Sequence, residues 1–301
     1  DSRYAVDFCS RLVYNRLSEY LWKQRVAGCE ESRMEACVEK KKGISGSTIK
    51  MIAIITMLID HIGAAILEKL MLQQAALEPG VGTVVTVNMG DPGMSLTVAY
   101  YITRCIGRVA FPLFIFLLVE GLEHTRNQWK YLMRMAIFAI VSEIPFDMAF
   151  NLCREQIFAG QLFEIHHQNV FFTLTIGLLT IIGLKKVGES KLPPFPAMVF
   201  RFGIPIAGMA LAWVLQTDYG AVGVLAIVVM YLFRKKKVLA SAMTCLSLLL
   251  SSAMELTAFI AVWPVTKYNG SRGWKLKWLF YLFYPAHLLI LWLICLGMGI
   301  A

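Results

Sequence analysis

Predominantly apolar stretches, separated by short charged segments, follow one another along most of this chain. A helix needs about 20 mostly apolar residues to cross the hydrocarbon core of a bilayer, where every backbone polar group must be satisfied internally. Eight stretches approach this character and predict transmembrane helices at 47–69, 104–123, 130–150, 169–185, 197–216, 219–233, 238–262 and 278–298. The pattern therefore predicts an all-α fold, a polytopic membrane bundle of about eight helices.

The composition agrees with a membrane protein. The 301 residues are 57% hydrophobic and 16% charged, and the mean hydropathy is +0.61, which is far from the average of soluble domains. The net charge of +9 fits basic cytoplasmic loops, and no nucleic-acid-binding motif accompanies it. The seven cysteines are scattered without CxxC spacing, so neither a metal site nor a disulfide framework is expected.

Residues 1–42 differ from the rest of the chain. They are too charged for a signal peptide, and their apolar positions recur at roughly helical spacing. This pattern predicts an amphipathic segment on the cytoplasmic membrane surface, followed by a transmembrane domain over residues 43–301.

The distribution of Lys and Arg predicts the orientation of the chain. With a cytoplasmic N-terminus, three cytoplasmic loops carry most of the basic residues, namely Arg126, Lys130, Arg134, Lys185, Lys186, Lys191 and the run 234–237. The loop 263–277 is also basic but would be external. Either it breaks the rule, or residues 238–262 enter and leave the membrane on the same side. We expect a multi-pass membrane protein whose N-terminus is cytoplasmic.

The first predicted span contains Asp60 and His61 next to each other. Ionisable groups at bilayer depth are costly and usually functional. Lys50 is eleven residues before His61, which puts the two on nearly the same helix face about 16 Å apart. A neutral imidazole there could accept a proton from an amine or hydroxyl. Asp60 could fix the tautomer of that imidazole, or it could pair with another helix.

The second span adds two pairs of polar residues at i,i+4 spacing. Arg104 and Arg108 carry forked guanidinium groups that suit phosphate or carboxylate, although anchoring at the membrane interface explains them as well. Glu120 and His124 are also four residues apart. They could line a site, or form a simple pair at the cytoplasmic edge.

The later spans contribute more polar side chains. Two carboxylates four residues apart bracket a proline, as at the end of a broken helix that lines a cavity. The candidates that would line a polar chamber are Glu143, Asp147, Asn169, Asp218, Tyr284 and His287. Helix capping is the alternative for Asn169 and Asp218, and an aromatic belt is the alternative for Tyr284.

Seven separated motifs occur in order along the chain, at 49–63, 108–112, 120–126, 142–147, 168–174, 218–220 and 280–287. Together they resemble the TraX family of bacterial membrane proteins over about residues 45–300. The best-known role in that family is N-terminal acetylation of the pilin subunit of conjugative plasmids. The family is similar to a wider group of membrane acyltransferases that acetylate cell-surface sugars.

That wider group carries a basic residue, ten intervening residues and then a catalytic histidine on the first span. Lys50 and His61 match this spacing. The resemblance implies that Lys50 helps hold coenzyme A and that His61 is the catalytic base. Arg104 and Arg108 are further candidates for donor binding, and Arg108 or Asn169 for stabilising the developing oxyanion.

The function that we expect is an integral membrane acetyltransferase. It would move an acetyl group from acetyl-CoA to an amine or hydroxyl, on a peptide N-terminus or a surface glycan, with His61 and Asp60 at the catalytic centre. The expected partners are acetyl-CoA, this acceptor and the lipid bilayer, with no metal and no nucleic acid. A transporter for a small anion or a proton-coupled substrate is one alternative, and a non-catalytic assembly factor is another.

Overall fold

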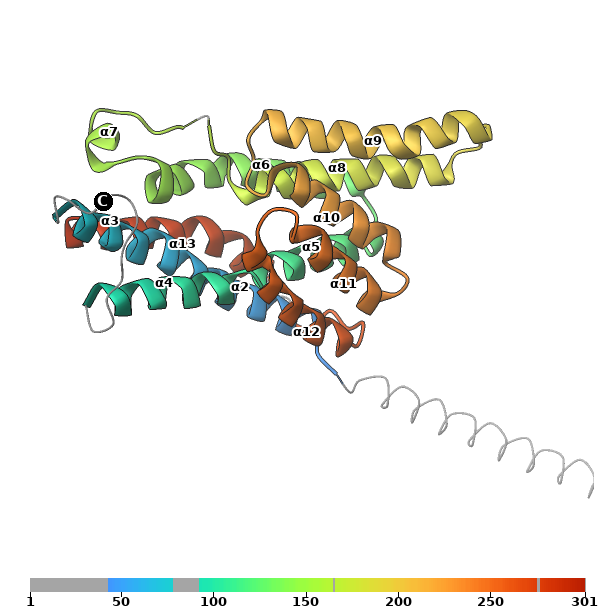
Figure 1. Ribbon diagram of the computed structural model, residues 1–301. Helices are drawn as coiled ribbons and strands as arrows, with labels where there is room; N and C mark the ends of the chain where they lie inside the picture. Colours follow the sequence, from blue (N-terminus) through green and yellow to red (C-terminus); the bar gives the residue numbers. More distant parts are fainter. Residues whose placement is uncertain (1–42, 78–91, 165, 275–276, 301) are drawn as a thin grey trace, which may run out of the picture.

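The computed structural model describes residues 43–77, 92–164, 166–274 and 277–300. Within these ranges the chain is helical apart from turns and two isolated β-bridges, as Figure 1 shows. The predicted all-α fold is thus confirmed. The amphipathic segment predicted at 1–42 lies outside the described residues and stays a prediction.

Among the described residues, four helical runs are long and apolar enough to cross a membrane, at Gly46–Gln74, Ser95–Glu123, Val170–Glu189 and Pro194–Val214. The first run joins α2 (Gly46–Ile62), the π-helix η1 (Gly63–Leu67) and α3 (Glu68–Leu77), and the second joins α4 (Pro92–Gly107) to α5 (Ala110–Glu123). The other two are α8 (Val170–Glu189) and α9 (Pro194–Val214). The chain is therefore a membrane protein. The other apolar helical stretches among the described residues are 10–17 residues long, so the count of eight spans stays a prediction.

The second span begins about nine residues earlier than the sequence predicted. The prediction placed it at 104–123, whereas the helical run covers Ser95–Glu123. A serine, two threonines and two tyrosines lower the hydropathy of residues 95–103, and this hides the first turns of the helix. As a consequence, Arg104 and Arg108 lie well inside this helical run. They therefore do not anchor its end at the membrane interface.

The predicted span at 238–262 is a hairpin. It consists of α11 (Lys237–Leu248), a turn, the 3₁₀-helix η3 (Ala253–Ala261) and α12 (Val262–Thr266). Twelve residues of α-helix rise about 18 Å, which is too short for a core of about 30 Å. The two arms pack against each other, so the hairpin returns to the end of the bundle from which it starts.

The chain after this hairpin pairs with the segment that precedes α2. Ile44 N donates to Lys267 O at 2.7 Å, and Asn269 N donates to Ile44 O at 3.1 Å. Lys237, at the start of the hairpin, lies 4.4 Å over the Tyr268 ring. The basic loop thus lies at the same end of the bundle as the other basic residues, which is the second alternative considered for residues 238–262. We call this end the basic end.

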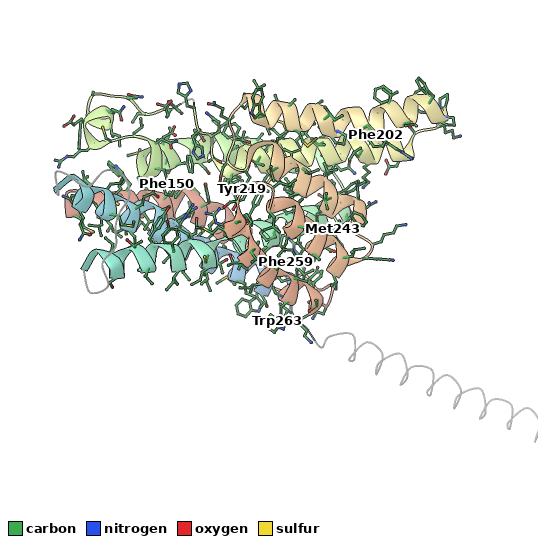
Figure 2. All side chains as sticks on the ribbon, viewed as in Figure 1. Phe150, Phe202, Tyr219, Met243, Phe259 and Trp263 are labelled. Atoms are coloured by element: carbon green, nitrogen blue, oxygen red, sulfur yellow. The ribbon has the colours of Figure 1, made fainter. Side chains whose placement is uncertain are left out.

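The remaining helices complete the bundle around α10 (Gly220–Phe233), which packs against α8, α9 and α11. Helix α6 (Gln128–Phe146) continues into the π-helix η2 (Asp147–Asn151), is followed by the short α7 (Arg154–Phe158), and packs against α8 and α13 (Lys277–Met298). Figure 2 shows Tyr219 within the bundle and Phe202 on α9 at its edge. The interior position of Tyr219 matters for the site.

Candidate functional site

Asp60 meets Arg104 and Arg108 where α2 packs against α4. Arg104 Nη1 donates to Asp60 Oδ2 at 2.6 Å, and Arg108 Nη2 lies 3.6 Å from Asp60 Oδ1. This approach depends on Gly107, because a Cβ atom there would lie 2.1 Å from Asp60 Oδ1. The structure thus brings together three of the side chains that the sequence singled out.

Arg108 uses most of its donors within the protein. Its Nη1 donates to Glu255 Oε1 at 3.0 Å and to Tyr219 Oη at 3.2 Å, and its Nε donates to Arg104 O at 3.4 Å. Glu255 is only 1% exposed and comes from η3 of the hairpin. Two carboxylates therefore balance two guanidinium groups, which is the condition for burying such charges. We call Asp60, Arg104, Arg108, Glu255 and Tyr219 the ionic cluster.

Sequence reasoning missed Glu255 and Tyr219 as members of this cluster. Glu255 did carry a signal, because it is an isolated carboxylate within the apolar stretch 245–263. Ionisable groups at bilayer depth are costly and usually functional, and this holds for Glu255 as it does for Asp60. Tyr219 carried no signal of this kind, since a tyrosine beside a turn is common.

His61 lies beside the ionic cluster but contacts a different partner. His61 Nδ1 is 2.7 Å from His287 Nε2, and the two rings are nearly parallel with an interplanar angle of 3°. His287 Nδ1 is in turn 2.8 Å from the backbone oxygen of Phe283. Asp60 therefore pairs with another helix, and the group that contacts the His61 imidazole is His287.

Aromatic rings and irregular helix surround this histidine pair. Phe150 and Tyr284 meet the His61 ring edge to face, at centroid distances of 5.4 and 6.0 Å. His287 is buried, whereas His61 is only partly buried. The π-helix η1 begins two residues after His61, and η2, which carries Phe150, packs against η1. Such π-turns are frequent at functional sites.

Glu143, Asp147 and Asn169 form a second cluster at the junction of α6, η2 and α8. Asn169 Nδ2 donates to Ala139 O at 2.8 Å and to Glu143 Oε2, while Asn169 Oδ1 caps α8 by accepting from Phe171 N at 2.9 Å. Both amide hydrogens of Asn169 are thereby used. The alternative reading of Asn169 as a helix cap is confirmed.

Asp147 joins the same junction to the loop that follows it. Its Oδ1 accepts from Asn151 Nδ2 at 2.7 Å and its Oδ2 accepts from Glu164 N at 2.9 Å. The Tyr284 ring packs against the Phe171 ring of α8, with 4.8 Å between the ring centroids. These contacts hold the α6–α8 junction in place beside the histidine pair.

Asp218 lies in the turn before α10. Its N–H donates to Gln168 O at 2.9 Å, and its carbonyl oxygen accepts from the Thr173 hydroxyl. The residue at the N-cap of α10 is Tyr219, with φ of 60°, and no side chain caps this helix. The alternative of Asp218 as the helix cap is therefore wrong, because the turn places the next residue at the cap, and the cavity-lining role of Asp218 stays a prediction.

Glu120, His124 and Lys50 lie away from His61, toward the basic end. Glu120 Oε1 is 3.1 Å from Lys237 Nζ, and His124, whose side chain is 70% exposed, is 3.6 Å from Glu120 Oε2. Glu120 and His124 thus form the simple pair at a helix end that was the alternative to lining a site. Lys50 and His61 share the unbroken α2, so the predicted helical separation of about 16 Å applies to them.

Among the described side chains, no group of three or more His, Cys, Asp or Glu residues is placed to hold a metal ion.

The chain is similar to a curated bacterial protein and to one protein family. A curated protein of Dichelobacter nodosus, named "Probable fimbrial assembly protein FimC, serogroup H1", is 28% identical over 209 residues, which cover 64% of this chain and 82% of that protein. No solved structure matches the chain. The family model described as "TraX protein" matches residues 45–295. Because that match spans most of the 301 residues, the chain belongs to the TraX family.

Proposed function

We propose that this protein is a membrane acetyltransferase that moves an acetyl group from acetyl-CoA to an acceptor amine or hydroxyl. The observation that carries the proposal is that Nδ1 of His61 lies 2.7 Å from Nε2 of a buried second histidine, His287, which comes from another helix. The relative from Dichelobacter nodosus is named for fimbrial assembly. Because a fimbrial subunit is a protein, we favour a peptide N-terminus as the acceptor over a surface glycan.

In the proposed reaction, His61 accepts the proton that the acceptor loses as it attacks the thioester carbonyl carbon. A bond forms between that carbon and the acceptor nitrogen or oxygen, and the carbon–sulfur bond breaks. The same proton then passes from His61 to the thiolate, which leaves as free coenzyme A. A general base placed in this way typically contributes a factor of about 10² to 10⁴.

The ionic cluster suggests which group stabilises the oxyanion. Arg108 gives its donors to Glu255, Tyr219 and a backbone oxygen, and Asn169 has used both amide hydrogens. Among the described contacts Arg104 donates one hydrogen bond, from Nη1 to Asp60. Since a guanidinium carries five N–H groups, Arg104 retains donors and is our choice for the oxyanion.

We expect Arg104→Lys to lower kcat by about 10²-fold while leaving the KM for acetyl-CoA nearly unchanged. Lysine keeps a cation beside Asp60 but loses the fork that can serve two acceptors at once. Steady-state acetyl transfer measures both constants. A kcat within about threefold of the unaltered protein would remove Arg104 from this role.

Lys50 and the basic end are proposed to hold the phosphates of coenzyme A on the cytoplasmic side. We expect Lys50→Ala to raise the dissociation constant of coenzyme A by about tenfold, equal to about 1.4 kcal/mol. Arg154→Ala is a suitable control, because Arg154 is exposed on the short α7, which lies at the other end of the bundle from the basic end (Figure 1). Calorimetric titration of each variant in nanodiscs compares the affinities, and equal affinities would contradict the role of Lys50.

The proposed function is tested directly with the purified chain in nanodiscs. Radiolabelled acetyl-CoA is supplied with a short peptide whose N-terminus is free, and with the same peptide already acetylated. Label is expected on the first peptide only, with one free thiol released for each acetyl group transferred. Absence of both label and thiol, together with flux of a small anion in vesicles without coenzyme A, would favour a transporter instead.

A further inference from the structure

The partners of the histidine pair identify which ring nitrogens carry hydrogen. A carbonyl oxygen only accepts, so the 2.8 Å contact with Phe283 O places a hydrogen on His287 Nδ1. Burying a charge is costly, so we take both rings as neutral at rest. His287 Nε2 then bears a lone pair and accepts, at 2.7 Å, from Nδ1–H of His61.

We infer that His287 is a positioning residue that fixes His61 as the Nδ1–H tautomer and leaves the Nε2 lone pair for the acceptor. This inference deepens the proposed function and rests on it for its catalytic part. In free histidine either nitrogen can carry the hydrogen, and a base with the wrong nitrogen protonated cannot take the acceptor's proton. The hydrogen bond to His287 removes that ambiguity.

The surroundings of His287 suit such a role. Its ring stacks on Phe283 at 4.7 Å with an interplanar angle of 12°, and its side chain is buried. The ring therefore has a fixed plane as well as a fixed backbone acceptor. Rotation of His287 would break both contacts, so its Nε2 stays directed at His61.

A neutral orienting group also fits the depth of the site. Asp60 is next to His61 on α2, but its carboxylate is paired with Arg104 at 2.6 Å. It therefore adds no unbalanced charge beside the histidine pair. When His61 Nε2 takes the acceptor's proton, its Nδ1–H remains bonded to His287 Nε2, whose lone pair stabilises the imidazolium. When that proton passes to the thiolate, both rings are neutral again.

The test observes the tautomer by ¹⁵N NMR on the full chain, labelled with [¹⁵N]histidine and held in nanodiscs. The chain has five histidines, and His61→Ala assigns the His61 signals. We expect a protonated Nδ1 and a bare Nε2. His287→Leu should abolish this preference, whereas His287→Gln, whose side-chain oxygen can accept in place of Nε2, should retain it. A protonated Nε2 in the unaltered protein, or an unchanged tautomer in His287→Leu, overturns the inference.

Kinetics test the catalytic part. We expect His287→Leu to lower kcat by about 10²-fold with little change in the KM for acetyl-CoA, and His287→Gln to restore about tenfold of that loss. Melting temperatures of the two variants show whether they are folded alike. Equal kcat values for His287→Leu and the unaltered protein refute the positioning role. A protein that shows the expected tautomer but transfers no acetyl group refutes the proposed function and leaves the assignment of the tautomer standing.

Discussion

Replacing His61 by alanine is expected to lower the rate of acetyl transfer by about 10³-fold. The change removes the only group that we propose to take the acceptor's proton, and general-base catalysis supplies a factor of this size. Because His61 is only partly buried as a residue and its contacts with Phe150 and Tyr284 are edge-on, the protein should stay folded. Single-turnover transfer of labelled acetyl groups, with protein in excess over acetyl-CoA, isolates the chemical step.

His166→Ala is the matched control for this experiment. The His166 side chain is 85% exposed and comes from the loop between α7 and α8. Its removal should leave the transfer rate unchanged. If His61→Ala retained the unaltered rate, His61 would not be the base, and the function of the histidine pair would have to be sought in transport or assembly.

A pH profile adds a second measure of the same group. A base that must be neutral to act loses activity as it becomes protonated at low pH, so the acidic limb of kcat/KM should follow His61. Substitution of His61 should remove that limb and leave a flat residual rate. The acidic limb would persist in the variant if another group were responsible.

The membrane character and several residues of the candidate site could be predicted from the sequence, because apolar stretches and the polar residues within them are visible locally. Asp60 and His61 stand out as charged or polar groups within an apolar stretch. Arg108, Glu143, Asn169 and His287 were singled out as well because they lie in the TraX motifs. In the structure Glu143, Asn169 and His287 are buried, and the Arg108 side chain is 15% exposed.

What could not be predicted depends on contacts between distant segments. Nothing local indicates that His287 would meet His61, which lies 226 residues away. The turn within residues 238–262 was also hidden, because the apolar composition of a hairpin and of a single span is similar. Since this turn brings Glu255 to Arg108, missing it also meant missing the second carboxylate of the ionic cluster.

Asp60→Asn is expected to lower the free energy of unfolding by about 3 to 5 kcal/mol. The side chains of Asp60, Arg104 and Arg108 are only 15 to 22% exposed, so two guanidinium groups would be left facing a single carboxylate, Glu255. Denaturant titration in detergent micelles measures this loss. Glu123→Gln is the control, since Glu123 pairs with Arg234 at 3.1 Å but the two side chains, 39% and 30% exposed, are more solvated than those of the ionic cluster. Such exposed pairs contribute about 0 to 1 kcal/mol.

Removing one arginine together with Asp60 should recover part of this loss. Arg104→Gln alone leaves the Asp60 carboxylate facing a single, more distant guanidinium, whereas the double variant restores the balance of one carboxylate and one guanidinium around Arg108. We expect the double variant to be more stable than the sum of the two single changes predicts, by about 1 to 3 kcal/mol. Strict additivity would mean that the 2.6 Å ion pair does not hold α2 against α4 in the membrane, and that Asp60 is retained for another reason.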